Sequence, residues 1–230
     1  MYDEDWGDLM ARISLFDIVG PIMVGPSSSH TAGAVRLGLA TRRILGEEVR
    51  KATIYLHGSF AATYWGHRTD VALIAGLLGM GMADERIPRA LELAQDAGLE
   101  YSFHSANLGD VHPNSVEIKV QGDHGQLTVG GASIGGGRIN LFNIDGFEAA
   151  VDGSYTVLMT KHRDEPGVIA EITRILAHHG INIAFLDVSR KMRGSEAMLL
   201  AETDDPIPSE VIEHVQRLPG VLMVRSLPCF

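Results

Sequence analysis

The fold of the C-terminal third of this chain is decided by the stretch DEPGVIAEITRILAHHGINI at residues 164–183. Its apolar residues recur at helical spacing until Gly180, so residues 167–179 are predicted to form an amphipathic helix. The apolar residues that follow predict a strand over residues 181–189. A loop, a helix and a strand in this order are typical of one half of a split βαβ unit.

The flanking segments complete that unit. Residues 155–162 are strand-like, and Gly194 marks a turn into a third strand at residues 196–203. A short helix at residues 209–217 then leads to a last strand at residues 221–226. The resulting order, βαββαβ, predicts a ferredoxin-like domain with both helices on one side of its sheet.

The third strand of this domain is apolar on both faces. Ala197, Leu199 and Ala201 alternate with Met198 and Leu200, so one face meets the helices and the other is left open. The two edges of the sheet are unpaired as well, and such edges are usually covered. We therefore expect the chain to self-associate through this domain.

A first domain precedes the ferredoxin-like one. The polar linker at residues 152–154 predicts domains at residues 1–152 and 153–230. Helices and strands are mixed in the first domain, which predicts an α+β fold with α/β as the alternative. The expected helices cover residues 32–45, 70–80 and 88–97, and the expected strands cover residues 52–57, 101–105, 115–121, 126–133 and 139–144.

The first expected helix follows the stretch GPSSSHT at residues 25–31. Glycine and proline break the preceding apolar segment, and Ser29 or Thr31 suits the N-cap of the helix. The first amides then point outward at the positive end of the helix dipole, which makes an anion-binding cradle. A well-capped helix with surface serines is the alternative. His30 favours the cradle, since an imidazole beside an anion site can move protons near neutral pH.

The composition limits the classes of partner. The 230 residues carry a formal net charge of -10 without a compensating Lys/Arg cluster, which argues against nucleic acid and anionic membranes. The chain starts with an acidic segment rather than a signal peptide and has no apolar run that could span a bilayer, so we expect a cytoplasmic protein. Its one cysteine, Cys229, cannot by itself hold an iron-sulfur cluster, which takes about four thiolates.

Five ordered motifs give the chain a resemblance to a known family. They are ISLFD at residues 13–17, GPSSSHT at 25–31, GHRTD at 66–70, HPNSV at 112–116 and SIGGG at 133–137. Together they resemble the beta subunit of the bacterial iron-sulfur-dependent L-serine dehydratase, or L-serine ammonia-lyase, over nearly the whole chain. The resemblance implies conversion of L-serine to pyruvate and ammonia, with the 4Fe-4S cluster on a separate alpha subunit.

The resemblance also implies a fold and site residues. The first domain is expected to have the allosteric-substrate-binding fold, which the family shares with some phosphoglycerate dehydrogenases. His30 and His67 suit proton transfer, provided that the fold brings them together. His67 stands just before the helix expected at residue 70, so it too is expected at a helix start; a surface or capping histidine is the alternative. The expected ligands of the substrate carboxylate are Ser27, Ser28, Ser29 and Thr31.

The ferredoxin-like domain resembles the ACT domain, a small-molecule regulatory module. Gly167 leaves room for a ligand or a neighbouring chain, and Asn182 can bind the backbone of an amino acid, so these two residues form the expected ligand site between two copies. The alternative is that Gly167 only relieves crowding after Pro166 and that the domain binds nothing.

Other interpretations of the chemistry stay open. The glycines of SIGGG form either a tight turn or a close approach to a ligand, and a P-loop is excluded because its Lys-Ser/Thr ending is missing. A pyridoxal-phosphate mechanism is disfavoured because no lysine stands in a phosphate-binding context. The runner-up function is a regulatory subunit that senses an amino acid without catalytic residues. A third is a structural half whose motifs stabilise an interface.

Overall fold

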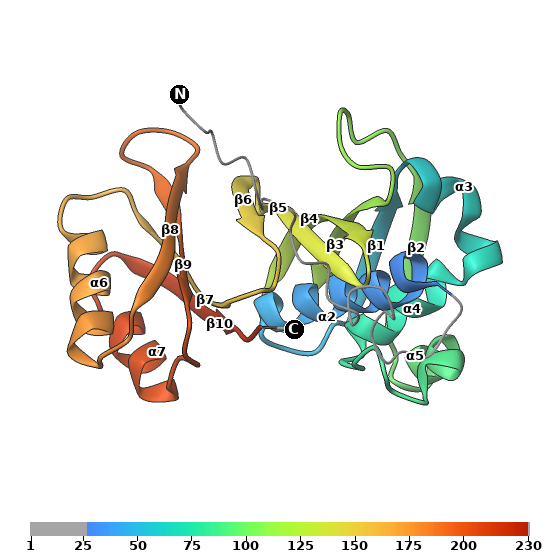
Figure 1. Ribbon diagram of the computed structural model, residues 1–230, viewed down its shortest axis with the longest axis horizontal. Coiled ribbons are helices and arrows are strands. Elements are labelled where there is room, and N and C mark those ends of the chain that lie inside the picture. Colours follow the sequence, from blue (N-terminus) through green and yellow to red (C-terminus); the bar gives the residue numbers. More distant parts are fainter. Residues whose placement is uncertain (1–26, 230) are drawn as a thin grey trace, which may run out of the picture.

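A computed structural model describes residues 27–229 of the chain as two β-sheets, each with helices packed on it (Figure 1). The ISLFD motif and the start of GPSSSHT lie outside the described residues. The first sheet has six strands in the order β2-β1-β3-β4-β5-β6, and the second has four in the order β10-β7-β9-β8. This mixed architecture confirms the predicted α+β class.

The first sheet and its helices form the first unit. Its helical segments are η1 (Ser28–Gly33), α2 (Ala34–Leu45), α3 (Gly58–His67), α4 (Thr69–Leu77), η2 (Ile87–Arg89) and α5 (Ala90–Asp96). Its strands are β1 (Lys51–Leu56), β2 (Glu100–Ser105), β3 (Ser115–Gln121), β4 (Gln126–Gly135), β5 (Arg138–Ile144) and β6 (Phe147–Val151). Only β1 and β2 run parallel among these paired strands, and α3, α4 and α5 lie in the crossover between them.

No sequence pattern predicts two of these elements, α3 and β6. The segment of α3 reads GSFAATYWGH, with glycine, aromatic and β-branched residues that have low helix propensity. β6 follows a tight turn in which Asp145 and Gly146 both have positive φ, 52° and 78°. After this turn the chain returns as one more strand beside β5.

The helices α2 and α4 pack closely in the layer that carries the site. α2 contacts β3, β4 and β5, and α4 packs against α2. A Cβ on Gly38 would collide with the carbonyl oxygen of Leu73, and a Cβ on Gly76 would collide with that of Val35. The two backbones can approach because both positions lack a side chain.

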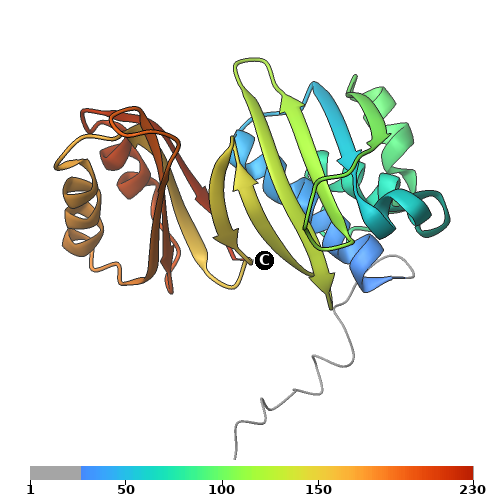
Figure 2. The same cartoon turned by 90° about the horizontal axis from the view of Figure 1, so that it is seen from above.

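The second unit has the predicted βαββαβ order. Its elements are β7 (Thr156–Arg163), α6 (Val168–His178), β8 (Ile183–Arg190), β9 (Glu196–Thr203), α7 (Ser209–Gln216) and β10 (Val221–Leu227). Both helices cover the face of the sheet that points away from the first unit (Figures 1 and 2), where they bury Leu199 and Ala201. The ferredoxin-like prediction is confirmed, while the domain limits at residues 152 and 153 stay a prediction.

The inner face of the second sheet is not open, contrary to the expectation from the sequence. Met198 and Leu200 of β9 are only 1% and 3% exposed and belong to the same hydrophobic core as the first unit. Val157 and Met159 of β7 join that core. The alternation predicted for β9 is correct, but the first unit of the same chain covers the inner apolar face. That face therefore gives no reason to expect self-association.

Hydrogen bonds also join the two units. The guanidinium of Arg225 on β10 donates to the carbonyls of Ile44 and Leu45 at 3.2 and 3.3 Å. These carbonyls end α2, whose C-cap, Gly46, has φ 78°. A Cβ on Gly46 would lie 2.5 Å from Arg225 Nε, so both the backbone angle and the close approach require glycine. Within residues 27–229, no helix is long and apolar enough to cross a membrane.

Candidate functional site

The serine run forms the first turn of a helix. η1 is a wide π-helical turn that runs into α2, and Ser27 is its N-cap, with extended backbone at φ -138° and ψ 126°. The Ser27 hydroxyl accepts from the His30 amide at 3.1 Å, and its carbonyl accepts from the Thr31 amide at 2.9 Å. The predicted N-caps, Ser29 and Thr31, are therefore wrong. Both lie inside the turn because the helix begins earlier than its apolar pattern indicates.

The turn keeps donors available for an anion. In a helix each amide donates to the carbonyl of a residue about four positions earlier. The amides of Ser28 and Ser29 have no such acceptor within the helix, because the helix begins with these residues. They stand at the positive end of the helix dipole. Both side chains are half-buried, and Ser29 Oγ lies 3.4 Å from Ser27 Oγ. Ser27 thus caps the turn, while the amides of Ser28 and Ser29 stay available as donors.

His30 is buried, with 8% of its surface exposed, among three hydroxyl groups. Its Nδ1 lies 3.1 Å from Ser29 Oγ, and its Nε2 lies 3.1 Å from Thr63 Oγ1 and 3.4 Å from Ser59 Oγ. Thr63 donates its single hydroxyl proton to the Ser59 carbonyl at 2.8 Å, so it accepts from His30. In the neutral ring the proton is therefore on Nε2, and Nδ1 is a base that faces Ser29.

The helix α3 brings His67 next to His30. The two ring centroids are 4.6 Å apart with their planes at 78°, while Phe60 packs edge-on against His30 at 5.2 Å. His67 is exposed and ends α3. The expectation that His67 begins a helix is wrong, since His67 ends α3 and α4 starts only at Thr69.

The surroundings of His30 favour its neutral form. Burial lowers the pKa of His30 from the ordinary value of 6.5, and repulsion from His67 lowers it further. A neutral imidazole with its Nδ1 lone pair directed at the serine run can accept a proton at physiological pH.

Three buried hydroxyl groups near the turn have no hydrogen-bond partner within the described part of the chain. They belong to Thr31 on η1, Thr69 at the start of α4 and Ser133 on β4. Both α4 and β4 contact η1, and a Cβ on Gly33 would collide with the hydroxyl of Ser133. Because buried polar groups are rarely unpaired, each of these hydroxyls can still take a polar partner from outside the described residues.

The SIGGG motif ends β4 and forms the turn into β5. Gly135 pairs with Arg138, and the two residues between them, Gly136 and Gly137, have φ 61° and 77°. The tight-turn interpretation is correct, since positive φ at both central residues is what a two-residue hairpin needs. The carbonyl of Gly137 accepts from Arg36 Nη1 at 2.8 Å, which ties the turn to α2.

Sequence reasoning missed Ser59 and Thr63 because both lie on α3, which no pattern predicts.

Contacts with the HPNSV motif fix the start of α3. The Ser59 amide donates to the Pro113 carbonyl at 2.8 Å, and Gly58 has φ 52° where a Cβ would lie 2.7 Å from the same oxygen. The loop that carries HPNSV therefore anchors the start of α3.

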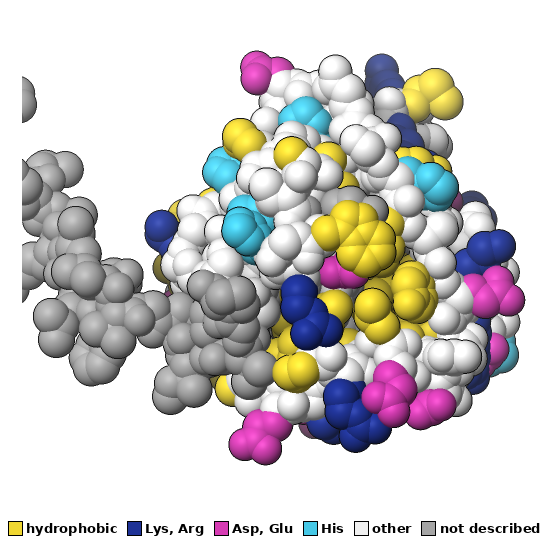
Figure 3. Space-filling view, turned by 90° about the vertical axis from the view of Figure 1, so that its right-hand side faces the viewer, with side chains coloured by type: hydrophobic (Ala, Val, Ile, Leu, Met, Phe, Trp, Pro, Cys, Tyr) yellow, Lys and Arg dark blue, Asp and Glu magenta, His cyan; other side chains and the backbone are white. Residues whose placement is uncertain are grey.

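The junction between α3 and α4 fixes the other end of α3. Arg68 stands there in the left-handed region at φ 56°, a conformation that non-glycine residues adopt only where the surroundings impose it. Asp70 in the next turn is 5% exposed, and burial raises the pKa of its carboxyl. Figure 3 looks onto this end of the molecule, where histidine side chains lie around a group of hydrophobic ones.

The residues of this chain do not fit an iron-sulfur cluster. Cys229 is the only cysteine and is exposed, whereas a cluster takes about four thiolates. The described residues do hold one group of clustered metal-ligating side chains, His179, Glu210 and His214. It lies at α6 and α7, at the opposite end of the molecule from η1 (Figure 1).

The two residues expected to bind an ACT ligand do not meet within one chain. Gly167 is the N-cap of α6 at φ 95°, and Asn182 follows the other end of that helix. The 11 residues of α6 separate them by about 16 Å at about 1.5 Å per residue. Only a second copy can bring a Gly167 and an Asn182 together.

The fold and the site define a chain of two parts, a mixed unit with a histidine and hydroxyl site and a ferredoxin-like unit. Residues 14–141 match the family described as serine dehydratase beta chain, and residues 155–220 match the ACT domain. The first match covers more than half of the chain.

Relatives of similar length agree with this assignment. The chain is 39% identical to the probable L-serine dehydratase, beta chain, of Bacillus subtilis (strain 168), over 93% of this chain and 97% of that protein. It is 40% identical to the L-serine dehydratase, beta chain, of Peptoniphilus asaccharolyticus, over 86% and 90%. It is also 28% identical to the D-3-phosphoglycerate dehydrogenase of a Synechocystis species, over 82% of this chain but 34% of that enzyme. The chain belongs to the serine dehydratase beta chain family, as its motifs predict.

Proposed function

We propose that this chain is the beta subunit of an iron-sulfur-dependent L-serine dehydratase, which converts L-serine to pyruvate and ammonia together with an alpha subunit. Two relatives of nearly equal length are named L-serine dehydratase beta chains, and a beta chain implies a partner. The single cysteine supports a 4Fe-4S cluster held by that partner rather than by this chain.

The pairing of His30 with His67 beside the serine run carries the proposal. Loss of water from serine needs a base for the α-proton, help for the departing hydroxyl and a hold on the carboxylate. His30 is neutral and has a lone pair on Nδ1, so it takes the α-proton. The cluster on the partner supplies a Lewis acid for the hydroxyl. His67 is exposed, so it can share that step with the partner and hand a proton to the leaving group.

The serine run binds the substrate carboxylate in this proposal. The amides of Ser28 and Ser29 and the hydroxyl of Ser28 are donors at the positive end of a helix, where anions are favoured. The buried hydroxyl of Thr31 is a further donor. Ser27 contributes mainly as the N-cap that keeps the turn in place.

Self-association belongs to the proposal on new grounds. The strand β8 is an unpaired edge of the ACT sheet, and Phe185, Leu186 and Val188 on it are 59%, 45% and 40% exposed. Pairing of two such edges would cover them. The full chain should therefore sediment as a dimer. The test uses the full chain because an isolated ACT fragment would also expose Met198 and Leu200, which the first unit covers.

A regulatory amino-acid-binding subunit is the second candidate, and the ACT domain favours it. Reconstitution under anaerobic conditions separates the two. Alone, this chain should hold no iron-sulfur cluster and show no serine dehydratase activity, and activity should appear when the alpha subunit is added. A brown, iron-loaded preparation of this chain alone would contradict the placement of the cluster. An alpha subunit that is fully active by itself would favour the regulatory role.

A further inference from the structure

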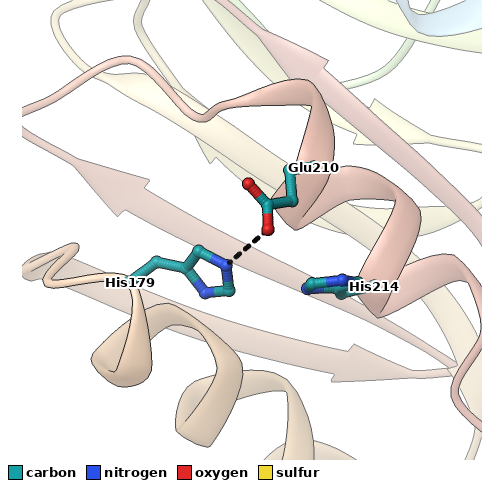
Figure 4. Close-up of side chains that lie close together, drawn as sticks. All are labelled: His179, Glu210 and His214. Atoms are coloured by element: carbon teal, nitrogen blue, oxygen red, sulfur yellow. Dashed lines mark ion pairs between the residues drawn. The ribbon is translucent and has the colours of Figure 1, made fainter.

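A second group of functional side chains lies in the ACT domain. His179 is the C-cap of α6, while Glu210 and His214 stand on α7. One ligand atom of each lies within 4.8 Å of the others. Figure 4 shows that the three side chains converge on the space between the two helices. Glu210 and His214 share one face of α7 because residues four apart on a helix are neighbours.

The hydrogen bonds of His179 leave its other nitrogen directed at the carboxylate. Nδ1 lies 2.9 Å from the carbonyl oxygen of Ile175, which can only accept, so Nδ1 carries a proton. In the neutral ring Nε2 is then a lone pair that faces Glu210 Oε1 at 3.8 Å. Two acceptors in this arrangement leave room between them for a shared cation, a metal ion or a proton on Nε2, in place of solvent.

The orientation of His179 favours the metal ion. Histidines that bind metals commonly donate their second ring N–H to a carboxylate or a backbone carbonyl, which fixes the tautomer and the direction of the ring. The bond to Ile175 does this for His179. His214 reaches the same space from α7 and adds a second imidazole, which an ion pair between His179 and Glu210 alone would not need.

We propose that His179, Glu210 and His214 bind a divalent transition metal of the zinc class and so join the end of α6 to α7. Two imidazoles and a carboxylate are a known ligand set for zinc, whereas calcium and magnesium prefer oxygen alone. Ligands about 2.0 to 2.2 Å from zinc stand roughly 3 to 3.5 Å apart, so the side chains must close slightly. Glu210 can do so because 69% of its side chain is accessible.

The metal has a structural role in this proposal rather than a catalytic one. It lies in the other unit from η1, which carries His30, and it fixes the segment where α6 ends and the chain turns toward the edge strand β8. Three protein ligands leave the fourth position of a tetrahedral zinc ion to water.

Zinc titration of the full chain, prepared without a polyhistidine tag, tests the proposal by calorimetry with the metal alone. The wild type should bind one equivalent at this site. His214→Ala and Glu210→Gln should each weaken binding at least about tenfold, since even loss of an outer-shell partner costs about 10- to 100-fold. His178→Ala is the matched control, because His178 is an exposed neighbour at the same helix end outside the group, and it should bind as the wild type does.

Thermal melting gives an independent readout. Zinc should raise the melting temperature of the wild type and of His178→Ala by linkage, but not that of His214→Ala. Without metal, Glu210→Gln should melt with the wild type because its side chain is exposed. Zinc affinity that is equal in the wild type and both site variants, or no zinc binding by the wild type, would overturn the proposal and leave a plain ion pair.

Discussion

The ACT domain and the histidine site are specified by the sequence in different ways. Each helix and strand of the ACT domain follows from its own periodicity and its own turn residues. The site depends on α3, which lacks a helical pattern and yet places Ser59, Thr63 and His67 around His30. A functional site can thus rest on a segment that is held by its neighbours, here the HPNSV loop and the α4 junction, rather than by its own propensity.

Replacement of His30 should have the largest effect. In the complex reconstituted with an alpha subunit, His30→Ala should lower kcat about 100- to 10,000-fold, the range of a lost general acid or base. His104→Ala, an exposed histidine on β2 of the same unit, should leave turnover unchanged. Both variants should assemble as the wild type does. Near-normal turnover of an assembled His30→Ala complex would make this histidine structural and remove the contrast between the two regions.

The shared core gives the next largest effect. Leu200→Ala, which opens a cavity where β9 meets the first unit, should lower the free energy of unfolding by about 2 to 5 kcal/mol. Met192→Ala, in the turn between β8 and β9 and 69% exposed, should change it by less than about 0.5 kcal/mol. Chemical denaturation of the full chain measures both. Equal, small losses for the two variants would mean that the ACT sheet does not pack on the first unit.

Serine replacements should divide the serine run into two roles. Ser28→Ala should raise KM about 10-fold or more with unchanged stability, because a hydrogen bond to a charged group contributes about 1.5 to 3 kcal/mol. Ser27→Ala should instead lower stability by about 1 kcal/mol, as expected for a lost N-cap, with little change in KM. The anion cradle is refuted if Ser28→Ala binds serine normally and melts early.

Titration of His30 should show the smallest effect. Because burial and His67 both lower its pKa, His30 in the folded chain should stay neutral below pH 6.5 and gain its proton only in more acidic solution. His67→Ala removes one of the two causes, so the pKa of His30 should rise part of the way toward 6.5. Nuclear magnetic resonance of the isolated chain measures this, with His30→Gln to assign the signal. A His30 that titrates above 6.5 in the wild type would contradict its buried, neutral state.

How much the sequence predicts depends on what holds each element. Apart from β6, the strands of both sheets carry clear patterns and are predicted within a few residues, as are α2, α4 and the ACT helices. The cap at Ser27 escapes prediction because a π-helical turn begins the helix before its apolar positions do. The covered face of β9 escapes it because an apolar strand face is the same in sequence whether a second copy or the same chain packs on it.

The site is predictable in its residues but not in its geometry. His30 and His67 are found by motif, and their contact is not, because it depends on where α3 ends. Ser59 and Thr63 have no signal at all, since hydroxyls at such positions are ordinary. For Gly167 and Asn182 the sequence predicts a shared ligand site, but it does not show that within one chain the two residues lie at opposite ends of α6.

A double-mutant cycle on His30 and His67 tests the central claim most directly, namely that the two histidines act as one catalytic site. The measurement is kcat of reconstituted complexes with His30→Ala, His67→Ala and both changes. Residues that work as a unit are strongly non-additive, so the double variant should be about as slow as the slower single variant. If the two losses multiply, the histidines act independently and the account of a joint site is wrong.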